Sequence, residues 1–457
     1  MTGVTAGLAA FIADARFEDL PAKAVRLATD AITDSIGVGL LGSRQPVADI
    51  LLRVVPRSPS ADGFLLGVSD HAHVLESALY NGAAIHAVDY DDTAHPSYSH
   101  PSAHLVPVLL ALGRQFHRTG RELVLAYVIG LEVEAKLGRS LNMDHYLRGW
   151  HSTGTLGAVS SAASASKLAG LDDHGTAVAL AIAASAASGL RANFGTMTKP
   201  LHAGLAARSG VLSALLAQEG FTAAPDVLED RYGYLKVFGT GNDTYAEVFQ
   251  RMADPWEITT PYGIALKLFP ACGSTHPAIE ASLALRHDLA GATPSAVRVG
   301  TNELCSQTLV YTDPQSPLEA KFSMEFCVAA ALVRGEVVMT TFTPEVLRDP
   351  EIQSLMKRIT VEVDDRVRFN TEHGAVVSVE TTDRRKFERL VPLARGKPDH
   401  WLTADELWTK FRDCARVVLS ESQARDAFDQ WQRLAEADSL EPLLSAIRFA
   451  PSLLTTA

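Results

Sequence analysis

The chain has 457 residues, 47% of them hydrophobic and 21% charged, and its formal net charge is −12. This length allows two or three globular domains with a large core. The acidic balance argues against a nucleic-acid-binding protein, which needs a basic face toward the phosphates. Four scattered cysteines without a CxxC pair argue against a zinc knuckle or a disulfide framework and favour reduced thiols in the cytoplasm.

The chain is expected to start with a helix. Its first residues include acidic side chains and lack the basic and apolar regions of a signal peptide. No apolar stretch reaches the ~20 residues that a membrane span requires. We therefore expect no membrane association.

The first 265 residues predict one helix after another. Apolar residues recur at helical spacing in the segments 21–41, 123–140 and 154–190. The last segment is rich in Ala, Ser and Gly, so it predicts two buried helices whose axes lie close together. Gly170 is expected to end the first of these two helices, and Asp172 or Asp173 to begin the second.

A GxGxxG motif stands at residues 37–42. The motif is typical of dinucleotide-binding proteins only when a strand precedes it and a helix follows it. Here the preceding residues have helical spacing, so a dinucleotide site is not expected.

The pattern changes after about residue 265. Alternating or β-branched residues predict strands at 296–299, 359–363 and 376–379, and helices are expected near 275–290, 319–334 and 344–357. Residues 403–447 return to amphipathic helix. The sequence thus predicts an α+β protein, with a helical domain of residues 1–265 completed by 403–457 and a smaller α/β domain of residues 266–402.

The first polar cluster is the segment HAVDYDDTAHPSYSHPSAH, residues 86–104. If the preceding helix continues to Thr93, then His86, Asp89 and Thr93 share one helix face. Surface residues that only cap helices are one alternative. A metal site is another, although the spacing matches no established metal signature.

The same segment is expected to begin a second helix after Pro101. Ser102 can cap that helix. His100 would then stand at the positive end of the helix, a place that favours anions.

Three further segments place His or Lys beside a predicted helix start: HYLRGWHSTGT around His151, NFGTMTKPLHAG around Lys199, and KLFPACGSTHP around Lys267 and His276. Ser152 or Thr153 is the expected cap of the first helix. A lysine at a helix N-terminus is unfavourable unless an anion is also present. Structural roles for these residues are the alternative. Cys272 beside His276 suggests a thiolate nucleophile, but no acyl-enzyme signature accompanies it.

This recurrence is the main functional signal of the sequence. Four helix N-termini that face one site would attract an anion, and a di- or tricarboxylate fits such a site. His or Lys can move a proton at the carbon α to a carboxylate.

The same segments resemble the MmgE/PrpD family, which includes 2-methylcitrate dehydratases, cis-aconitate decarboxylases and iminodisuccinate epimerases. The matching stretches are NGAAIHAVDYDDT, HYLRGWHSTGTLGA, NFGTMTKPLHAG, PACGSTHPAI and LEAKFSMEFCVAAAL. The resemblance extends over nearly the whole chain. The resemblance implies a large all-α helical domain formed by both chain ends, a smaller α/β lid domain with the substrate between the two, a homodimer, and no cofactor or metal.

The resemblance also implies roles for individual residues. The expected catalytic residues are His100, Lys199, His151 and Asp89, and the expected substrate-binding residues are Thr93, Lys267, His276 and Tyr311. Members that are decarboxylases have an Arg directly after the lysine matching Lys267, where this chain has Leu268. The loop before His100 is also one residue longer than theirs, and both departures weaken a decarboxylase assignment.

The leading prediction is a hydro-lyase similar to 2-methylcitrate dehydratase. It would remove the proton α to a carboxylate and expel the β-hydroxyl, with His100 and Lys199 as base and acid in unassigned order. An iminodisuccinate-type epimerase and a cis-aconitate-type decarboxylase use the same residues and are alternatives. A non-catalytic carboxylate-binding protein is the alternative from another class.

Overall fold

The computed structural model describes residues 3–239, 245–368 and 374–448. The fold is α+β and mostly helical, as predicted. The chain forms two compact units: the larger consists of Met1–Asn193, Met197–Leu266 and Thr403–Ala457, and the smaller of Phe194–Thr196 and Lys267–Leu402. The end of the predicted C-terminal segment, residues 449–457, lies outside the described residues. Among the described helices, none combines the length and apolar character needed to cross a membrane.

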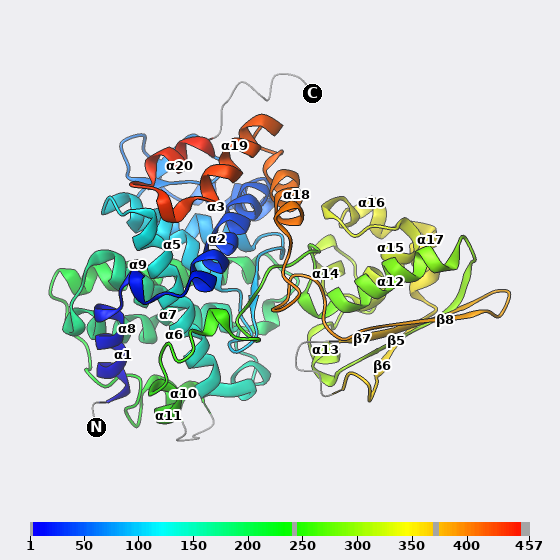
Figure 1. Cartoon of the computed structure of the whole chain (residues 1–457), viewed down its shortest axis with the longest axis horizontal. Helices are drawn as coiled ribbons and strands as arrows, with labels where there is room; N and C mark the ends of the chain where they lie inside the picture. The colour runs from blue at the N-terminus through cyan, green and yellow to red at the C-terminus, as the bar shows by residue number, and fades with distance from the viewer. Residues whose placement is uncertain (1–2, 240–244, 369–373, 449–457) are drawn as a thin grey trace. The chain divides into compact units, whose positions relative to one another are not determined.

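Helices make up most of the larger unit (Figure 1). Its helices are α1 (Val4–Asp14), α2 (Ala22–Gly42), α3 (Pro46–Val54), α4 (Val74–His86), α5 (Pro101–Gln115), α6 (Gly120–Leu147), α7 (Ser152–Ala169), α8 (Asp173–Ala186), α9 (Thr198–Gln218), α10 (Tyr234–Phe238), α11 (Tyr245–Phe249), α18 (Ala404–Ala415), α19 (Glu421–Trp431) and α20 (Glu441–Ala446). Two-residue strands form two antiparallel pairs, β1 (Gly63–Phe64) with β2 (His71–Ala72) and β3 (Thr93–Ala94) with β4 (Ile264–Ala265).

The predicted boundary between α7 and α8 is confirmed. Gly170 follows α7 with φ 68°, a left-handed conformation that glycine adopts without strain. Asp172 then caps α8, because its Oδ1 accepts a hydrogen bond from the backbone N–H of Gly175 at 2.7 Å.

Glycines let the central helices of this unit touch through their backbones. A Cβ atom on Gly82 of α4 would lie 2.7 Å from the Cα of Gly204 on α9. A Cβ on Gly154 of α7 would lie 2.2 Å from the carbonyl oxygen of Ser188. Helices α4, α5, α7 and α9 pack on one another at these close distances.

The GxGxxG motif lies inside α2 and serves helix packing. A Cβ on Gly37 would lie 2.9 Å from the ring of Phe411 on α18. A Cβ on Gly42 would lie 1.8 Å from the carbonyl oxygen of Ala84 on α4. Side chains at these positions would therefore push two neighbouring helices away from α2.

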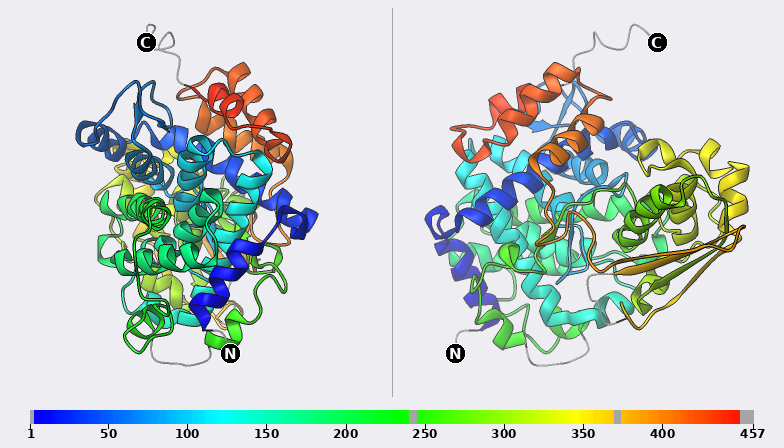
Figure 2. Two further views of the ribbon diagram at one scale, coloured as in Figure 1. Left: turned by 90° about the vertical axis from the view of Figure 1, so that its left-hand side faces the viewer. Right: turned by 45° about the vertical axis from the view of Figure 1, so that its right-hand side comes forward.

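The C-terminal helices α18 and α19 pack against α2. Figure 2 shows α18 to α20, in orange and red, beside the blue helix α2. The contact contains a fully buried ion pair, in which Nζ of Lys410 lies 2.8 Å from Oδ2 of Asp34. Lys410 also donates to the carbonyl oxygen of Tyr90 at 2.8 Å, so its buried charge has two partners.

The smaller unit contains a four-stranded sheet in the order β6-β5-β7-β8. Its strands are β5 (Pro294–Thr301), β6 (Ile359–Val363), β7 (Ala375–Thr381) and β8 (Lys386–Val391), and only the β5–β6 pair among them is parallel. Its helices are α12 (His276–Leu289), α13 (Glu303–Thr308), α14 (Pro317–Ala320), α15 (Met324–Arg334), α16 (Pro344–Leu347) and α17 (Pro350–Met356). Helices α12 and α15 cover one face of the sheet (Figure 1).

Two details of the smaller unit differ from the prediction. The helices expected at 319–334 and 344–357 are each split in two. The breaks have a local cause, because the side chains of Ser323 and Asp349 accept hydrogen bonds from the first turns of α15 and α17 and so start new helices there. Strand β8 was not predicted, because most of its residues are exposed at the sheet edge and give no apolar pattern.

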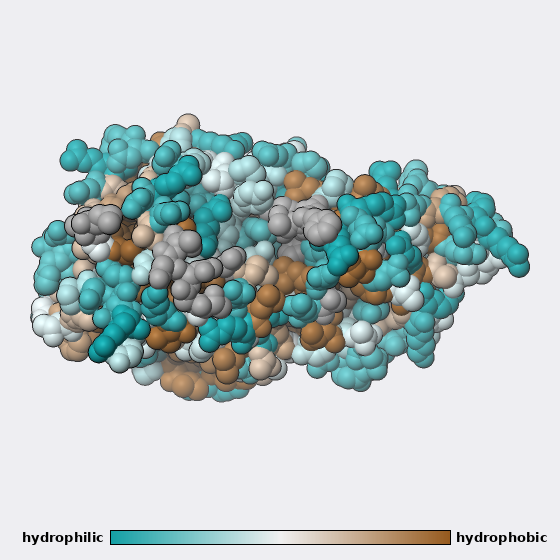
Figure 3. Space-filling view, turned by 90° about the horizontal axis from the view of Figure 1, so that it is seen from below, coloured by the Kyte–Doolittle hydropathy of each residue, from teal (hydrophilic) through white to brown (hydrophobic). Residues whose placement is uncertain are grey.

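Hydrophilic side chains are intermixed with apolar ones on the face shown in Figure 3. Exposed large apolar residues are scattered along the chain, with Tyr232 (76%) and Val54 (75%) the most exposed among those described. Isolated exposed hydrophobic side chains are ordinary in globular proteins. They do not mark a functional surface here.

Candidate active site

Histidine, aspartate and lysine side chains gather in the larger unit where α5, α7 and α9 begin and α4 ends. We call this group the histidine cluster; it consists of His86, Asp89, Asp91, His100, His151, Lys199 and His202. The close packing of these helices brings three positive helix ends to one place. That arrangement favours a bound anion.

Helix α4 ends at His86 and does not continue to Thr93. Asp89 has φ 54°, a left-handed conformation that a helix cannot contain. The expectation that His86, Asp89 and Thr93 share one helix face is therefore wrong. Thr93 lies in β3 and is paired with Ala265 of β4.

His100 occupies the N-cap position of α5, directly before Pro101. The predicted cap, Ser102, has another role, because its backbone N–H and its hydroxyl both bond to the carboxyl group of Asp92. The backbone N–H of His100 donates to Oγ1 of Thr153 at 3.1 Å. The start of α5 is therefore tied to the start of α7.

One ring nitrogen of His100 faces two oxygen acceptors. Nδ1 lies 2.8 Å from the backbone carbonyl oxygen of Asp92 and 3.4 Å from Oδ2 of Asp91. A carbonyl and a carboxylate only accept hydrogen bonds, so Nδ1 carries the hydrogen. In the neutral ring the basic lone pair is then on Nε2, which lies 3.9 Å from Oδ1 of Asp89.

Lys199 lies in the first turn of α9 and is buried. Its Nζ lies 2.6 Å from Oδ1 of Asp89, a short charge-assisted hydrogen bond. The same carboxylate oxygen of Asp89 thus faces both Lys199 and Nε2 of His100. One carboxylate oxygen therefore lies near both an ammonium group and the basic nitrogen of an imidazole ring.

His86 and Asp91 form a buried pair behind His100. Nδ1 of His86 lies 2.8 Å from Oδ2 of Asp91. Burial lowers the pKa of His86 to about 3, so its ring is neutral at pH 7. Burial also tends to raise the pKa of Asp91, but the neighbouring His86 and His100 hold that pKa well below its ordinary value. Asp91 is therefore a carboxylate that accepts from Nδ1 of His86.

His151 occupies the N-cap position of α7, so the expectation that Ser152 or Thr153 caps this helix is wrong. Its Nδ1 lies 2.9 Å from Nδ1 of His202 on α9. Burial, with Lys199 as the next cause, lowers the pKa of both rings. His151 and His202 are therefore neutral at pH 7 and share one hydrogen between these nitrogens.

Three predicted substrate-binding residues lie in the smaller unit. Lys267 is buried. His276 is the first residue of α12, and its Nε2 donates to the carbonyl oxygen of Ala271 at 3.2 Å. The hydroxyl of Tyr311 donates to the carbonyl oxygen of Phe194 at 2.8 Å.

The histidine cluster contains three residues for which no role was predicted: His86, Asp91 and His202. The sequence contains a pattern that could have indicated each of these residues. His86 and Asp91 stand in the first polar segment, and His202 follows Lys199 by three residues, a spacing that places both on one face of α9.

Part of the cluster also has the spacing of a cation site. One ligand atom from each of four residues lies within 4.8 Å of the others: His86, Asp89, Asp91 and His100. The ammonium group of Lys199, however, bonds directly to Asp89. A divalent cation held by Asp89 would lie close to that positive charge, so the donor set fits a cation poorly.

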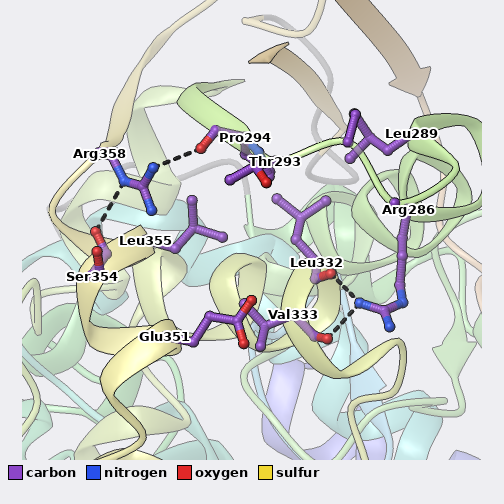
Figure 4. Close-up of a pocket in the computed structure, with 12 residues that line it drawn as sticks. Arg286, Leu289, Thr293, Pro294, Leu332, Val333, Glu351, Ser354, Leu355 and Arg358 are labelled. Atoms are coloured by element: carbon purple, nitrogen blue, oxygen red, sulfur yellow. Dashed lines mark hydrogen bonds between the residues drawn. The ribbon is translucent and has the colours of Figure 1, made fainter. Parts of the chain in front are cut away.

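A separate cavity of about 430 Å³ lies in the smaller unit (Figure 4). Arg286 and Arg358 line it, but their guanidinium groups donate to backbone carbonyls. Arg286 bonds to Leu332 and Val333 at the end of α15, and Arg358 bonds to Pro294 at 2.6 Å. Both arginines thus satisfy backbone carbonyls, and the histidine cluster is the better candidate for chemistry.

Comparisons with known proteins agree with the resemblance. The MmgE/PrpD N-terminal domain matches residues 6–246 and the MmgE/PrpD C-terminal domain matches residues 269–433. The cis-aconitate decarboxylase of Homo sapiens is 30% identical over 92% of this chain and 89% of that protein, and the one of Mus musculus is 28% identical over 98% and 94%. The 2-methylcitrate dehydratase of Salmonella typhimurium is 25% identical over 79% of each chain.

Proposed function

Because the chain belongs to the MmgE/PrpD family, we propose that it is a lyase that acts on a small di- or tricarboxylate. The proposed reaction is the dehydration of a 2-methylcitrate-like acid. A proton leaves the carbon α to a carboxylate, and the β-hydroxyl leaves as water. The similar proteins named above are decarboxylases and dehydratases, both of which are lyases.

One observation supports the proposal most strongly. Oδ1 of Asp89 faces Nζ of Lys199 at 2.6 Å and Nε2 of His100 at 3.9 Å. An elimination needs a base and an acid near the same substrate, and this carboxylate holds one of each in place.

The roles follow from the protonation of the two groups. His100 keeps a hydrogen on Nδ1, so the basic lone pair of the neutral ring lies on Nε2, the atom that takes the α-proton. Lys199 donates a hydrogen bond from its Nζ to this carboxylate, so it is the proton donor of the pair and is assigned as the acid. His100 takes the proton, the C–H electrons form the new double bond, and the β C–O bond breaks as Lys199 donates a proton to the departing hydroxyl, which leaves as water. Exchange of protons with solvent restores both residues.

The negative charge that develops on the substrate carboxylate as the α-proton leaves needs stabilisation. The N-termini of α5, α7 and α9 and the ammonium group of Lys199 provide positive potential. The neutral rings of His86 and His151 add hydrogen-bonding groups without adding charge. No redox cofactor is part of this chemistry, and a cytoplasmic homodimer is proposed on the family resemblance alone.

Decarboxylation of cis-aconitate is the second candidate. It is favoured by the 28–30% identity to the two cis-aconitate decarboxylases named above, against 25–26% to 2-methylcitrate dehydratases. Against it, Leu268 stands where decarboxylase members have an arginine. Epimerisation of an acid such as iminodisuccinate would need the same proton abstraction, followed by return of the proton to the opposite face.

A nuclear magnetic resonance screen in deuterated water tests the proposal. The purified protein is incubated with 2-methylcitrate, citrate, cis-aconitate and iminodisuccinate. Loss of the hydroxyl supports dehydration, loss of CO₂ supports the second candidate, and deuterium uptake with inversion supports an epimerase. Binding without any turnover would contradict an enzymatic role.

A further inference from the structure

Two different oxygen atoms face Nδ1 of His100. The nearer is the backbone carbonyl oxygen of Asp92, at 2.8 Å, and the other is Oδ2 of Asp91, at 3.4 Å. The carbonyl fixes the position of the hydrogen but carries no net charge. The Asp91 carboxylate carries a full charge, so its effect grows when the ring becomes positive.

We propose that Asp91 is a positioning residue for His100: its carboxylate orients the ring and stabilises the positive charge that the ring gains when Nε2 takes the substrate proton. The inference rests on the proposed function, in which His100 is the base. Carboxylates behind catalytic histidines have this effect in other sites, where they hold the tautomer and stabilise the imidazolium.

The burial of Asp91 makes the effect strong. The residue is 0% exposed, so little solvent screens its charge. Burial alone raises the pKa of a carboxyl group, but His86 and His100 hold the pKa of Asp91 well below its ordinary value. Asp91 therefore remains a carboxylate over the whole range in which His100 can act as a base.

His86 bonds to the same oxygen of Asp91 that faces His100. Its Nδ1 donates to Oδ2 of Asp91 at 2.8 Å, and its ring centroid lies 4.4 Å from that of His100. Because burial lowers the pKa of His86 to about 3, this ring stays neutral and does not compete with His100 for a proton. Oδ2 of Asp91 thus faces both rings, and because His86 stays neutral, the charge of Asp91 acts on the ring of His100.

Other charged or titratable groups around His100 belong to several elements. They are Asp89 in the loop after α4, His86 of α4, His151 of α7 and Lys199 of α9, while Asp34 of α2 pairs with Lys410 and Glu134 of α6 faces His104. Asp89 already bonds to Lys199 at 2.6 Å. Asp91 is therefore the carboxylate whose charge bears most directly on His100.

The test is the substitution Asp91→Asn, which keeps the shape of the side chain and removes its charge. We expect kcat on the accepted polycarboxylate to fall about 10–100-fold, with little change in KM. The acidic limb of the pH profile of kcat/KM should move to lower pH, because His100 loses the charge that favours its protonated form.

A second measurement does not depend on turnover. Hydrogen–deuterium exchange at Cε1 of each histidine, read by mass spectrometry with fragmentation, gives the pH at which each ring takes up a proton. In Asp91→Asn the midpoint for His100 should move to lower pH. The variant must also keep the circular dichroism spectrum of the wild type.

Two control variants separate positioning from general damage. Glu134→Gln removes another buried carboxylate that faces a histidine, His104 at 3.3 Å, and should leave the His100 midpoint unchanged. His86→Asn keeps a donor near the position of Nδ1 and should move that midpoint less than Asp91→Asn does.

The proposal for Asp91 is overturned if the folded Asp91→Asn protein keeps the wild-type midpoint for His100, or if Glu134→Gln moves that midpoint equally. Failure of the proposed function has another signature, because the wild type would then turn over none of the polycarboxylates. The exchange measurement would still decide the role of Asp91.

Discussion

Nζ of Lys199 lies 2.6 Å from Oδ1 of Asp89, although the two residues stand 110 positions apart in the chain. The contact joins the first turn of α9 to the loop after α4. It depends on the backbone contact of Gly82 with Gly204, which brings these two helices together. Both side chains are buried, so neither charge is well solvated without the other.

Lys199→Met removes the proposed acid and keeps most of the side-chain volume. We expect kcat to fall about 10²–10⁴-fold, the usual contribution of a positioned general acid. Lys167→Met is a matched control, because Lys167 lies in the same unit and its Nζ donates to the carbonyl oxygen of Ala13. Steady-state kinetics should be measured on both variants. An equal loss of activity in the two variants would contradict the assignment of Lys199 as the acid.

His100→Asn removes the proposed base and keeps a donor toward the carbonyl oxygen of Asp92. The protein should fold and still bind the substrate, while the exchange of the α-proton with deuterated water falls at least about 10²-fold. His145→Asn serves as control, because His145 is buried in the same unit and bonds to Thr155 at 2.7 Å. Undiminished exchange in His100→Asn would show that another residue is the base.

Asp92 gives a prediction about stability and pH. Burial raises the pKa of its carboxyl group to about 8, whereas the ordinary value is 3.8. The folded protein thus binds a proton at Asp92 that the unfolded chain releases between about pH 4 and pH 8, so the contribution of Asp92 to stability falls as pH rises through that window.

Asp92→Asn removes this titration. Relative to this variant, the wild type should lose up to about 1.4 kcal/mol of unfolding free energy per pH unit between about pH 4 and pH 8. Above about pH 8 the difference in unfolding free energy between the two proteins should stay constant. Urea unfolding at several pH values measures the difference. A difference that is independent of pH would show that Asp92 is ionised in the folded protein.

Metal removal tests the alternative use of the histidine cluster. Because Lys199 bonds to Asp89, we expect activity to survive dialysis against a chelator and metal content to be far below one ion per chain. Elemental analysis and activity should be measured on the same sample. Activity that is lost on chelation and regained with one particular cation would favour a metal site at His86, Asp89, Asp91 and His100.

Local patterns in the sequence predict where the helices of this site begin. They do not predict which side chains contact one another within it. Pro101 and Pro200 mark two of the three helices that meet there, and the segments around His151 and Lys199 were identified as parts of the site. The contacts among them join residues as far apart as Asp89 and Lys199. Helical spacing carries no information about such contacts.

The loop after α4 was predicted incorrectly for a related reason. Its pattern continues that of the helix, but Asp89 has a positive φ, which no glycine in this loop signals. Aspartate adopts this conformation more readily than most residues, but its presence alone does not predict it. That turn is what allows Asp89 to face Lys199 and Asp91 to face His86. The roles of Asp91 and of the ring nitrogens of His100 therefore became evident only from the structure.

The most direct test of the account follows the α-proton of the substrate. The wild type and the double variant His100→Asn/Lys199→Met are incubated in deuterated water with the polycarboxylate that the wild type turns over best, and α-deuterium and free product are measured together. The account predicts that the wild type releases the α-proton and water in step, while the folded double variant does neither. Release of the α-proton by the double variant at the wild-type rate would contradict it.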